Sequence, residues 1–77
     1  MKSVEFEGKT YDMTHGSPFD RGSADSYYQR GELPHWYPEG TGNGERITEE
    51  DMSEEEVSAY RAGFHWNESM GNFKDWG

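Results

Sequence analysis

The chain has 77 residues, enough for one domain with a thin core, since a domain of this size buries about 60% of the surface that its unfolded chain exposes. Its 16 acidic residues against 7 lysines and arginines give a formal net charge of −9, which disfavours contact with anionic lipids and direct binding to DNA. It has no cysteine, no leading apolar run and nothing near the ~20 apolar residues that span a bilayer, so we expect a cytoplasmic protein with no membrane association.

The apolar composition is low for a folded protein. One Leu, one Ile, two Val and four Phe, together with the high net charge, are typical of a disordered chain. Three Trp, five Tyr and four Phe favour a fold instead, because each aromatic side chain can bury about 150–250 Å². We therefore expect a folded chain with a core built from aromatic side chains.

Residues 2–13 predict a β-hairpin. Apolar residues alternate with polar ones on both sides of a glycine, and they are Val4, Phe6, Tyr11 and Met13. A two-residue turn at Gly8 and Lys9 would place Phe6 opposite Tyr11, with glycine at the first central position of a type II′ turn. A lone hairpin is marginally stable, so its apolar face is expected to pack on a helix.

A first helix is predicted over residues 17–30. Ser17 can cap it, Pro18 suits its first position, and Asp20 lies in the first turn, where the helix dipole favours a negative charge. Because the residues that follow have low helix propensity, a start at Ser23 is the alternative.

Residues 31–52 predict a loop-rich centre, since prolines and glycines interrupt them at short intervals. The interrupting residues are Pro34, Pro38, Gly40, Gly42 and Gly44. The glycine run superficially resembles a phosphate-binding loop, but it lacks the preceding strand and the Gly-Lys-Ser/Thr ending of such loops. A flexible turn is expected here.

A second helix is predicted over residues 53–69, where Ser53 and Glu56 form a capping box and Gly71 supplies a stop. One apolar face carries Val57, Tyr60 and Phe64, and the roughly opposite face carries Ala59, Ala62, Gly63, Trp66 and Met70. Such a helix is expected between the hairpin and the first helix, with its small residues permitting close approach, and the aromatic tail 70–77 is expected to dock on the body. The chain thus predicts a single α+β domain with a short N-terminal hairpin packed on two helices.

The histidines, serines and carboxylates of the chain form neither a catalytic motif nor a metal-binding motif. His15, His35 and His65 are spaced too widely for a compact ligand motif, and no thiolate is present. The serines have no histidine in a nucleophile context, and a chain this short leaves little room for a pocket that would perturb a carboxylate. We expect no enzyme activity, no metal and no other cofactor.

An acidic surface is predicted at the start of the second helix. The acids concentrate at Glu49, Glu50, Asp51, Glu54 and Glu55, next to the capping Glu56. The plain interpretation is a solvated helix start. The alternative is a docking surface for a basic partner, which could imitate a nucleic acid.

Two stretches of the chain are dense in aromatic, charged and small residues. The first is Ser17-Pro18-Phe19-Asp20-Arg21-Gly22-Ser23-Ala24-Asp25-Ser26-Tyr27-Tyr28, then Arg30 and Pro34-His35; the second is Tyr60-Arg61-Ala62-Gly63-Phe64, then Gly71 and Phe73-Lys74-Asp75-Trp76-Gly77. Together they resemble a recurrent signature of small proteins, without an established activity, from tailed phages and some bacteria. The resemblance spans residues 15–77 and implies an accessory protein that acts in a bacterial host cytoplasm during infection. A fainter likeness is to the ribosome modulation factor, which is strongly basic, unlike this chain.

The signature and the neighbouring Trp36 supply candidates for partner binding. They are Asp20, Arg21, Asp25, Tyr28, Arg30, His35 and Trp36. The alternative is structural, with the two aspartates satisfying backbone groups and arginines. The leading hypothesis is a non-enzymatic protein-interaction module for a host or phage protein, acting as a monomer or small homo-oligomer. The alternatives are an acidic nucleic-acid mimic that inhibits a DNA- or RNA-binding protein and, more weakly, RNA or ribosome association.

Overall fold

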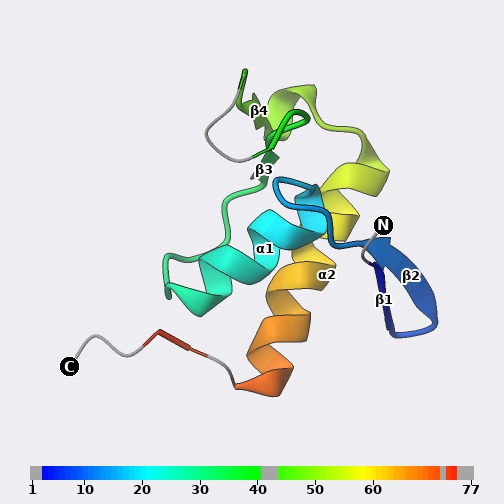
Figure 1. The fold of residues 1–77 in the computed structure, drawn as a ribbon, viewed down its shortest axis with the longest axis vertical. Coiled ribbons are helices and arrows are strands. Elements are labelled where there is room, and N and C mark those ends of the chain that lie inside the picture. Colours follow the sequence, from blue (N-terminus) through cyan, green and yellow to red (C-terminus); the bar gives the residue numbers. More distant parts are fainter. Residues whose placement is uncertain (1–2, 41–43, 72, 75–77) are drawn as a thin grey trace.

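The fold is mixed α+β, as the sequence predicts, and a computed structural model describes it for residues 3–40, 44–71, 73 and 74. In chain order the elements are β1 (Ser3–Phe6), β2 (Lys9–Asp12), α1 (Pro18–Tyr27), β3 (His35–Trp36), β4 (Ile47–Thr48), the 3₁₀-helix η1 (Glu49–Asp51) and α2 (Glu54–Met70). Figure 1 shows α1 and α2 crossing at the centre, with the β1–β2 hairpin on one side and the β3–β4 pair at one end. Residue 2 of the predicted hairpin, residues 41–43 of the glycine run, and residues 72 and 75–77 of the predicted tail lie outside the described residues.

The predicted hairpin forms, but its predicted turn and register are wrong. The turn lies one residue earlier, at Glu7 and Gly8, whose φ angles are both positive at 52° and 79°. Two positive φ angles are typical of a type I′ turn, whose twist matches that of the strands. Tyr11 consequently faces Val4 rather than Phe6. The predicted register would have placed a glutamate opposite an aspartate, and the observed one avoids that like-charge pair.

The first helix begins at its predicted cap and ends early. The Ser17 hydroxyl accepts a hydrogen bond from the backbone N–H of Asp20 at 3.3 Å, and the alternative start at Ser23 is wrong. The helix ends at Tyr27 rather than at residue 30, because the chain turns at Gln29 with a left-handed φ of 58°. The residues that follow are thereby directed away from the helix axis.

The described residues of the centre, 31–40 and 44–52, contain more secondary structure than a loop-rich prediction implies. β3 and β4 pair antiparallel with Trp36 opposite Ile47, and η1 follows at once. Two-residue strands carry no periodicity that a sequence pattern could reveal. This ladder brings the chain before Ile47 beside the chain after Trp36.

The second helix has the predicted caps at both ends. The Ser53 N–H donates to Glu56 Oε1 at 2.8 Å, and the Glu56 N–H donates to Ser53 Oγ at 3.1 Å, which completes the capping box. Gly71 follows the last turn with a φ of 66°, a left-handed conformation that glycine adopts without strain.

Two glycines set the distance between the helices. A Cβ atom on Gly22 would lie 1.9 Å from the carbonyl oxygen of Tyr60, and one on Gly63 would lie 2.0 Å from the carbonyl oxygen of Phe19. Both obstacles are backbone atoms, which cannot rotate away as a flexible side chain could. The prediction that Gly63 permits close approach is confirmed.

The core is built on aromatic side chains, with Phe19 1% and Tyr60 0% exposed. The Tyr11 ring stacks on Phe19 at 5.0 Å between centroids and seats the hairpin on α1, while Trp66 of α2 reaches the same ring at 5.5 Å. Phe64, expected on the same face as Tyr60, is only half-buried. Five polar side chains complete the interior, namely Ser17, Asp25, Ser26, His35 and Asn67.

The described part of the tail returns to the end of α1. The backbone N–H of Lys74 donates to the Tyr27 carbonyl oxygen at 2.7 Å. Phe73 remains 40% exposed. The Lys74 carbonyl oxygen also accepts from Gln29 Nε2 at 3.5 Å, so the docking of these two residues includes hydrogen bonds of Lys74 and no deep burial of the Phe73 ring.

Candidate functional site

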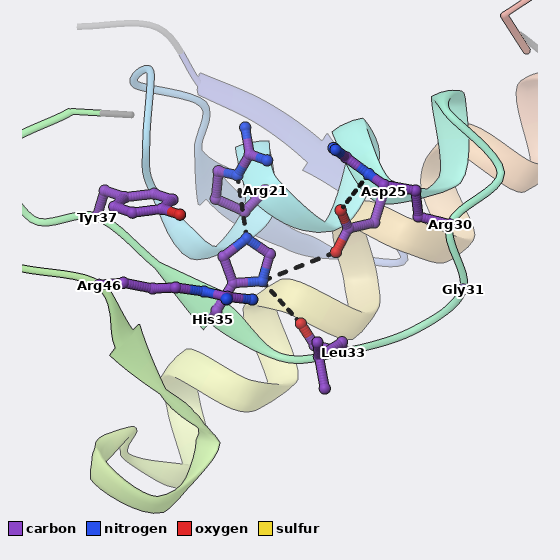
Figure 2. Close-up of a pocket in the computed structure, with 8 residues that line it drawn as sticks. All are labelled: Arg21, Asp25, Arg30, Gly31, Leu33, His35, Tyr37 and Arg46. Carbon is purple, nitrogen blue, oxygen red and sulfur yellow. Dashed lines mark hydrogen bonds and ion pairs between the residues drawn. The ribbon is translucent and has the colours of Figure 1, made fainter. Parts of the chain in front are cut away.

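A hollow of about 400 Å³ opens beside α1, the segment that follows it and the chain before β4. Its lining residues are Arg21, Asp25, Arg30, Gly31, Leu33, His35, Tyr37 and Arg46. Figure 2 shows His35 in the middle of these residues, with arginine side chains reaching it from different segments. We call it the arginine hollow. It brings together four of the seven predicted partner-binding residues, which are Arg21, Asp25, Arg30 and His35.

Asp25 forms the inner wall of the hollow, and its side chain is 6% exposed. One carboxylate oxygen lies 3.2 Å from Arg30 Nε, whereas the other accepts the Tyr60 hydroxyl hydrogen and lies 3.7 Å from His35 Nδ1. The backbone N–H of Arg30 also donates to the Asp25 carbonyl oxygen at 2.8 Å, so the end of α1 holds the two residues together. These partners stabilise a buried carboxylate that would be costly alone.

His35 is held as a neutral ring. Its Nδ1 lies 2.8 Å from the Leu33 carbonyl oxygen, which can only accept, so Nδ1 carries the proton and Nε2 accepts the Nε–H of Arg21 at 3.2 Å. Burial lowers the pKa of the His35 imidazole below its ordinary value. The Leu33 carbonyl and the Asp25 carboxylate oppose this shift of the pKa, and the Arg46 and Arg21 charges add to it. A neutral His35 can therefore position Arg21 near pH 7.

The arginine hollow is positive within an acidic chain. Arg21, Arg30 and Arg46 against Asp25 leave an excess of two positive charges there, whereas the whole chain carries −9. Arg46 is exposed, and across residues 3–40, 44–71, 73 and 74 it has no ion-pair or hydrogen-bond partner. Guanidinium donors beside a neutral imidazole are groups suited to binding an anion.

The other predicted partner-binding residues lie at or beyond the rim. The Tyr28 ring centroid lies 4.8 Å from the guanidinium carbon of Arg30. Asp20 is turned to the start of α1, where it accepts the backbone N–H of Gly16 at 2.9 Å. Trp36 lies in β3 with its indole N–H buried and unbonded to any residue that the structure describes. Asp20 and Trp36 thus do not line the hollow.

Four residues of the hollow were not among the predicted partner-binding residues, and they are Gly31, Leu33, Tyr37 and Arg46. Leu33 is 60% exposed, and the Tyr37 ring lies 5.7 Å from the guanidinium carbon of Arg21. One signal was present: two short β-prone stretches flank the glycine run, which is typical of a hairpin. That pairing would have placed Arg46 beside Tyr37.

The predicted acidic surface exists as an exposed patch. Its five residues stand on η1 and the first turn of α2, and they are Glu49, Glu50, Asp51, Glu54 and Glu55. Arg61 lies beside it, with its Nη2 3.9 Å from a Glu49 oxygen and its Nε 2.9 Å from a Glu32 oxygen. The patch borders the arginine hollow and is opposite to it in charge, since Leu33 and Arg46 line a smaller hollow together with Glu49 and Glu50.

The described ranges, residues 3–40, 44–71, 73 and 74, contain neither a metal-ligand cluster nor a membrane-spanning helix. Among those residues, no group of three histidine, aspartate or glutamate side chains is placed to hold a metal ion. No helix in the same ranges is both long and apolar enough to cross a bilayer. His15 and His65 lie outside the hollow, the first 3.9 Å from Asp20 and the second exposed on α2.

Acidification is expected to destabilise the fold through His35. Because burial holds its pKa in the folded state below the ordinary value of 6.5, the unfolded chain takes up the proton first, and the free energy of unfolding falls as the pH drops through that value. Protonation also removes Nε2 as the acceptor for Arg21. Thermal melting from about pH 7.5 to about pH 5 should show a falling midpoint, flattened in His35→Gln and retained in the exposed control His65→Gln. A wild-type midpoint that is constant over this range would contradict the assignment.

Comparison with known proteins finds no matching family model, no matching curated protein and no matching solved structure. The resemblance to small phage proteins stays a prediction.

Proposed function

We propose that the chain is a non-enzymatic protein-interaction module that takes an acidic segment of a partner protein into the arginine hollow. The observation that carries this proposal is the convergence of three of the chain's seven lysines and arginines on one hollow. A local positive potential within a negative surface steers an anionic group to that place. The same net charge disfavours a long nucleic-acid backbone, which would meet acidic surface beyond the hollow.

The rim of the hollow carries residue types that dominate protein–protein contacts. Tyr28 is 37% exposed, Leu33 is 60% exposed, and the guanidinium of Arg30 lies over the Tyr28 ring. Tyrosine and arginine are enriched among residues that contribute most of the energy of an interface. Asp25 already orders Arg30, so less side-chain freedom is lost when a partner binds.

The biological setting of the proposal follows from the resemblance of residues 15–77 to small phage proteins. We place the chain as a phage accessory protein in a bacterial host cytoplasm, with a host or phage protein as its partner.

A second candidate function is supported by the acidic patch. Five exposed carboxylates gathered on η1 and the first turn of α2 could replace the phosphates of a nucleic acid in a DNA- or RNA-binding protein. The patch is confined to one short stretch of the chain, whereas imitation of a nucleic acid favours carboxylates spread along the surface. The mimic is therefore the alternative.

Affinity capture from bacterial lysate with three forms of the chain tests the proposal. Arg46→Glu reverses one charge of the hollow, and Lys9→Glu makes the same change on the hairpin, which Figure 1 places away from the β3–β4 pair. A partner held by the wild type and by Lys9→Glu is expected to be lost with Arg46→Glu. A partner that Arg46→Glu retains would contradict the proposal.

Neutralising the acidic patch distinguishes the nucleic-acid mimic from the interaction module. Changing the five acidic residues to Gln or Asn, while leaving the capping Glu56 intact, removes the charge and keeps the helix start. Loss of the partner with this variant, together with its retention by Arg46→Glu, would favour the mimic. The interaction module predicts the reverse pattern.

A further inference from the structure

We infer that the arginine hollow binds a phosphate monoester as its dianion, carried on a phosphorylated side chain of the partner. The inference rests on the proposed function and names the group that the hollow recognises. It follows from the directions of the donors, the charge of the hollow and its size.

The donors reach the hollow from three separate segments. Arg21 comes from α1, Arg30 from the turn after it and Arg46 from the chain before β4, as Figure 2 shows. The ion pair with Asp25 runs through Nε of Arg30, and Arg46 has no ion-pair or hydrogen-bond partner among the described residues. A planar carboxylate matches one fork, whereas the oxygens of a tetrahedral phosphate can accept from several forks at once.

The charge of the hollow matches a dianion. Three guanidiniums and the Asp25 carboxylate leave an excess of two positive charges. A phosphate monoester carries close to two negative charges at neutral pH, and a carboxylate or a sulfate ester carries one. Asp25 is shielded from the ligand, since its side chain is 6% exposed and both oxygens face partners within the fold. The repulsion that a free carboxylate would exert is thereby reduced.

The size of the hollow favours an ester over a free ion. Its volume of about 400 Å³ exceeds what a phosphate group fills and leaves space for the carrier of that group. Leu33 and Tyr37 line the remaining space and offer apolar and aromatic surface to a side chain. A phosphorylated side chain would place its phosphate against the arginines and the rest of the side chain against Leu33 and Tyr37.

Titration of the ¹⁵N-labelled full chain with short synthetic peptides tests the inference. One peptide sequence is prepared with phosphotyrosine, sulfotyrosine, phosphoserine or glutamate at its centre, and inorganic phosphate and adenosine monophosphate serve as small-molecule probes. Sulfotyrosine keeps the tetrahedral shape and bears one charge less. We expect the phosphotyrosine or phosphoserine peptide to bind at least about tenfold more tightly than its sulfate or glutamate counterpart, because one more charge acts at close range. Arg46→Gln should lose this preference, and the hairpin variant Lys9→Gln should keep it.

Each other outcome overturns a stated part of the inference. Equal affinity for the phosphate and sulfate peptides would exclude a site for a dianion. Affinity for inorganic phosphate or adenosine monophosphate equal to that for the peptides would assign a small phosphate ligand rather than a phosphorylated partner. If no phosphate binds and partner capture still depends on Arg46, the inference fails while the proposed function stands. If capture is also independent of Arg46, both fail.

Discussion

Gly63→Ala is expected to destabilise the fold by about 3 kcal/mol or more, although alanine is ordinarily the better helix former. The added methyl group would lie 2.0 Å from the carbonyl oxygen of Phe19, so the two helices would have to separate. Separation would open the packing between Phe19 and Trp66 and weaken the contacts around the buried Tyr60. A domain of this size has only about 4–12 kcal/mol of stability in total, so the loss would be large.

Chemical denaturation measures this effect, with Ser58→Ala as the matched control. Ser58 is exposed on the same helix, and its replacement improves helix propensity without adding a contact across the crossing. The control is expected to be neutral or slightly stabilising. A Gly63→Ala variant as stable as the control would show that the helices do not cross as closely as described.

Tyr60→Phe is expected to lower the free energy of unfolding by about 2–4 kcal/mol, because the variant lacks the buried hydroxyl group. The hydroxyl donates to the Asp25 carboxylate and accepts the backbone N–H of Leu33 at 2.9 Å, and Tyr60 is fully buried. Burial, reinforced by the hydrogen bond to Asp25, raises the pKa of the Tyr60 hydroxyl far above its ordinary value, so it remains a donor at every working pH. Its removal leaves a buried carboxylate short of a partner, and both affected groups belong to residues that line the arginine hollow.

Denaturation and amide hydrogen exchange together test this role. The Leu33 amide should exchange faster in Tyr60→Phe relative to amides in the middle of α2, since its acceptor is gone. Tyr27→Phe is the control, because the Tyr27 hydroxyl has no hydrogen bond with a described residue. Unchanged stability in Tyr60→Phe would contradict the central place given to this hydroxyl.

The parts of the fold that depend on local chemistry could be predicted from the sequence. The Ser17 cap and the Ser53–Glu56 capping box are short-range patterns with a direct physical cause, and both appear where they were expected. Gly63 could be proposed as a close-contact residue because a glycine within a helix needs a packing reason. Its partner glycine at residue 22 instead indicated low helix propensity, which favoured the wrong alternative start.

The hairpin turn and the β3–β4 pair were not predicted correctly, because each depends on how two segments of the chain pair with one another. The sequence allows a hairpin turn on either side of Gly8, and the choice depends on the charges that then face each other across the strands. The β3–β4 pair is too short for any periodic signal. Both features depend on contacts between segments rather than on either segment alone.

The sequence predicted only half of the residues that line the arginine hollow, because the hollow also depends on contacts between distant segments. Asp25, Arg30 and His35 lie close together in the sequence, so they could be proposed together as partner-binding residues. The sequence did not decide between partner binding and a structural role for them. The structure gives Asp25 a supporting role through its buried contacts. Arg46 joins them only through the β3–β4 pairing, for which the two short β-prone stretches beside the glycine run are the one signal in the sequence.

Arginine footprinting of the complex with the captured partner tests the central claim most directly. Phenylglyoxal modifies accessible guanidinium groups, and mass spectrometry measures the extent at each arginine with and without the partner. Arg46 and Arg30 are expected to lose reactivity in the saturated complex, whereas Arg61, whose side chain is 53% exposed beside the acidic patch, should keep it. Protection of Arg61 with Arg46 and Arg30 still fully reactive would contradict the assignment of the arginine hollow as the contact surface.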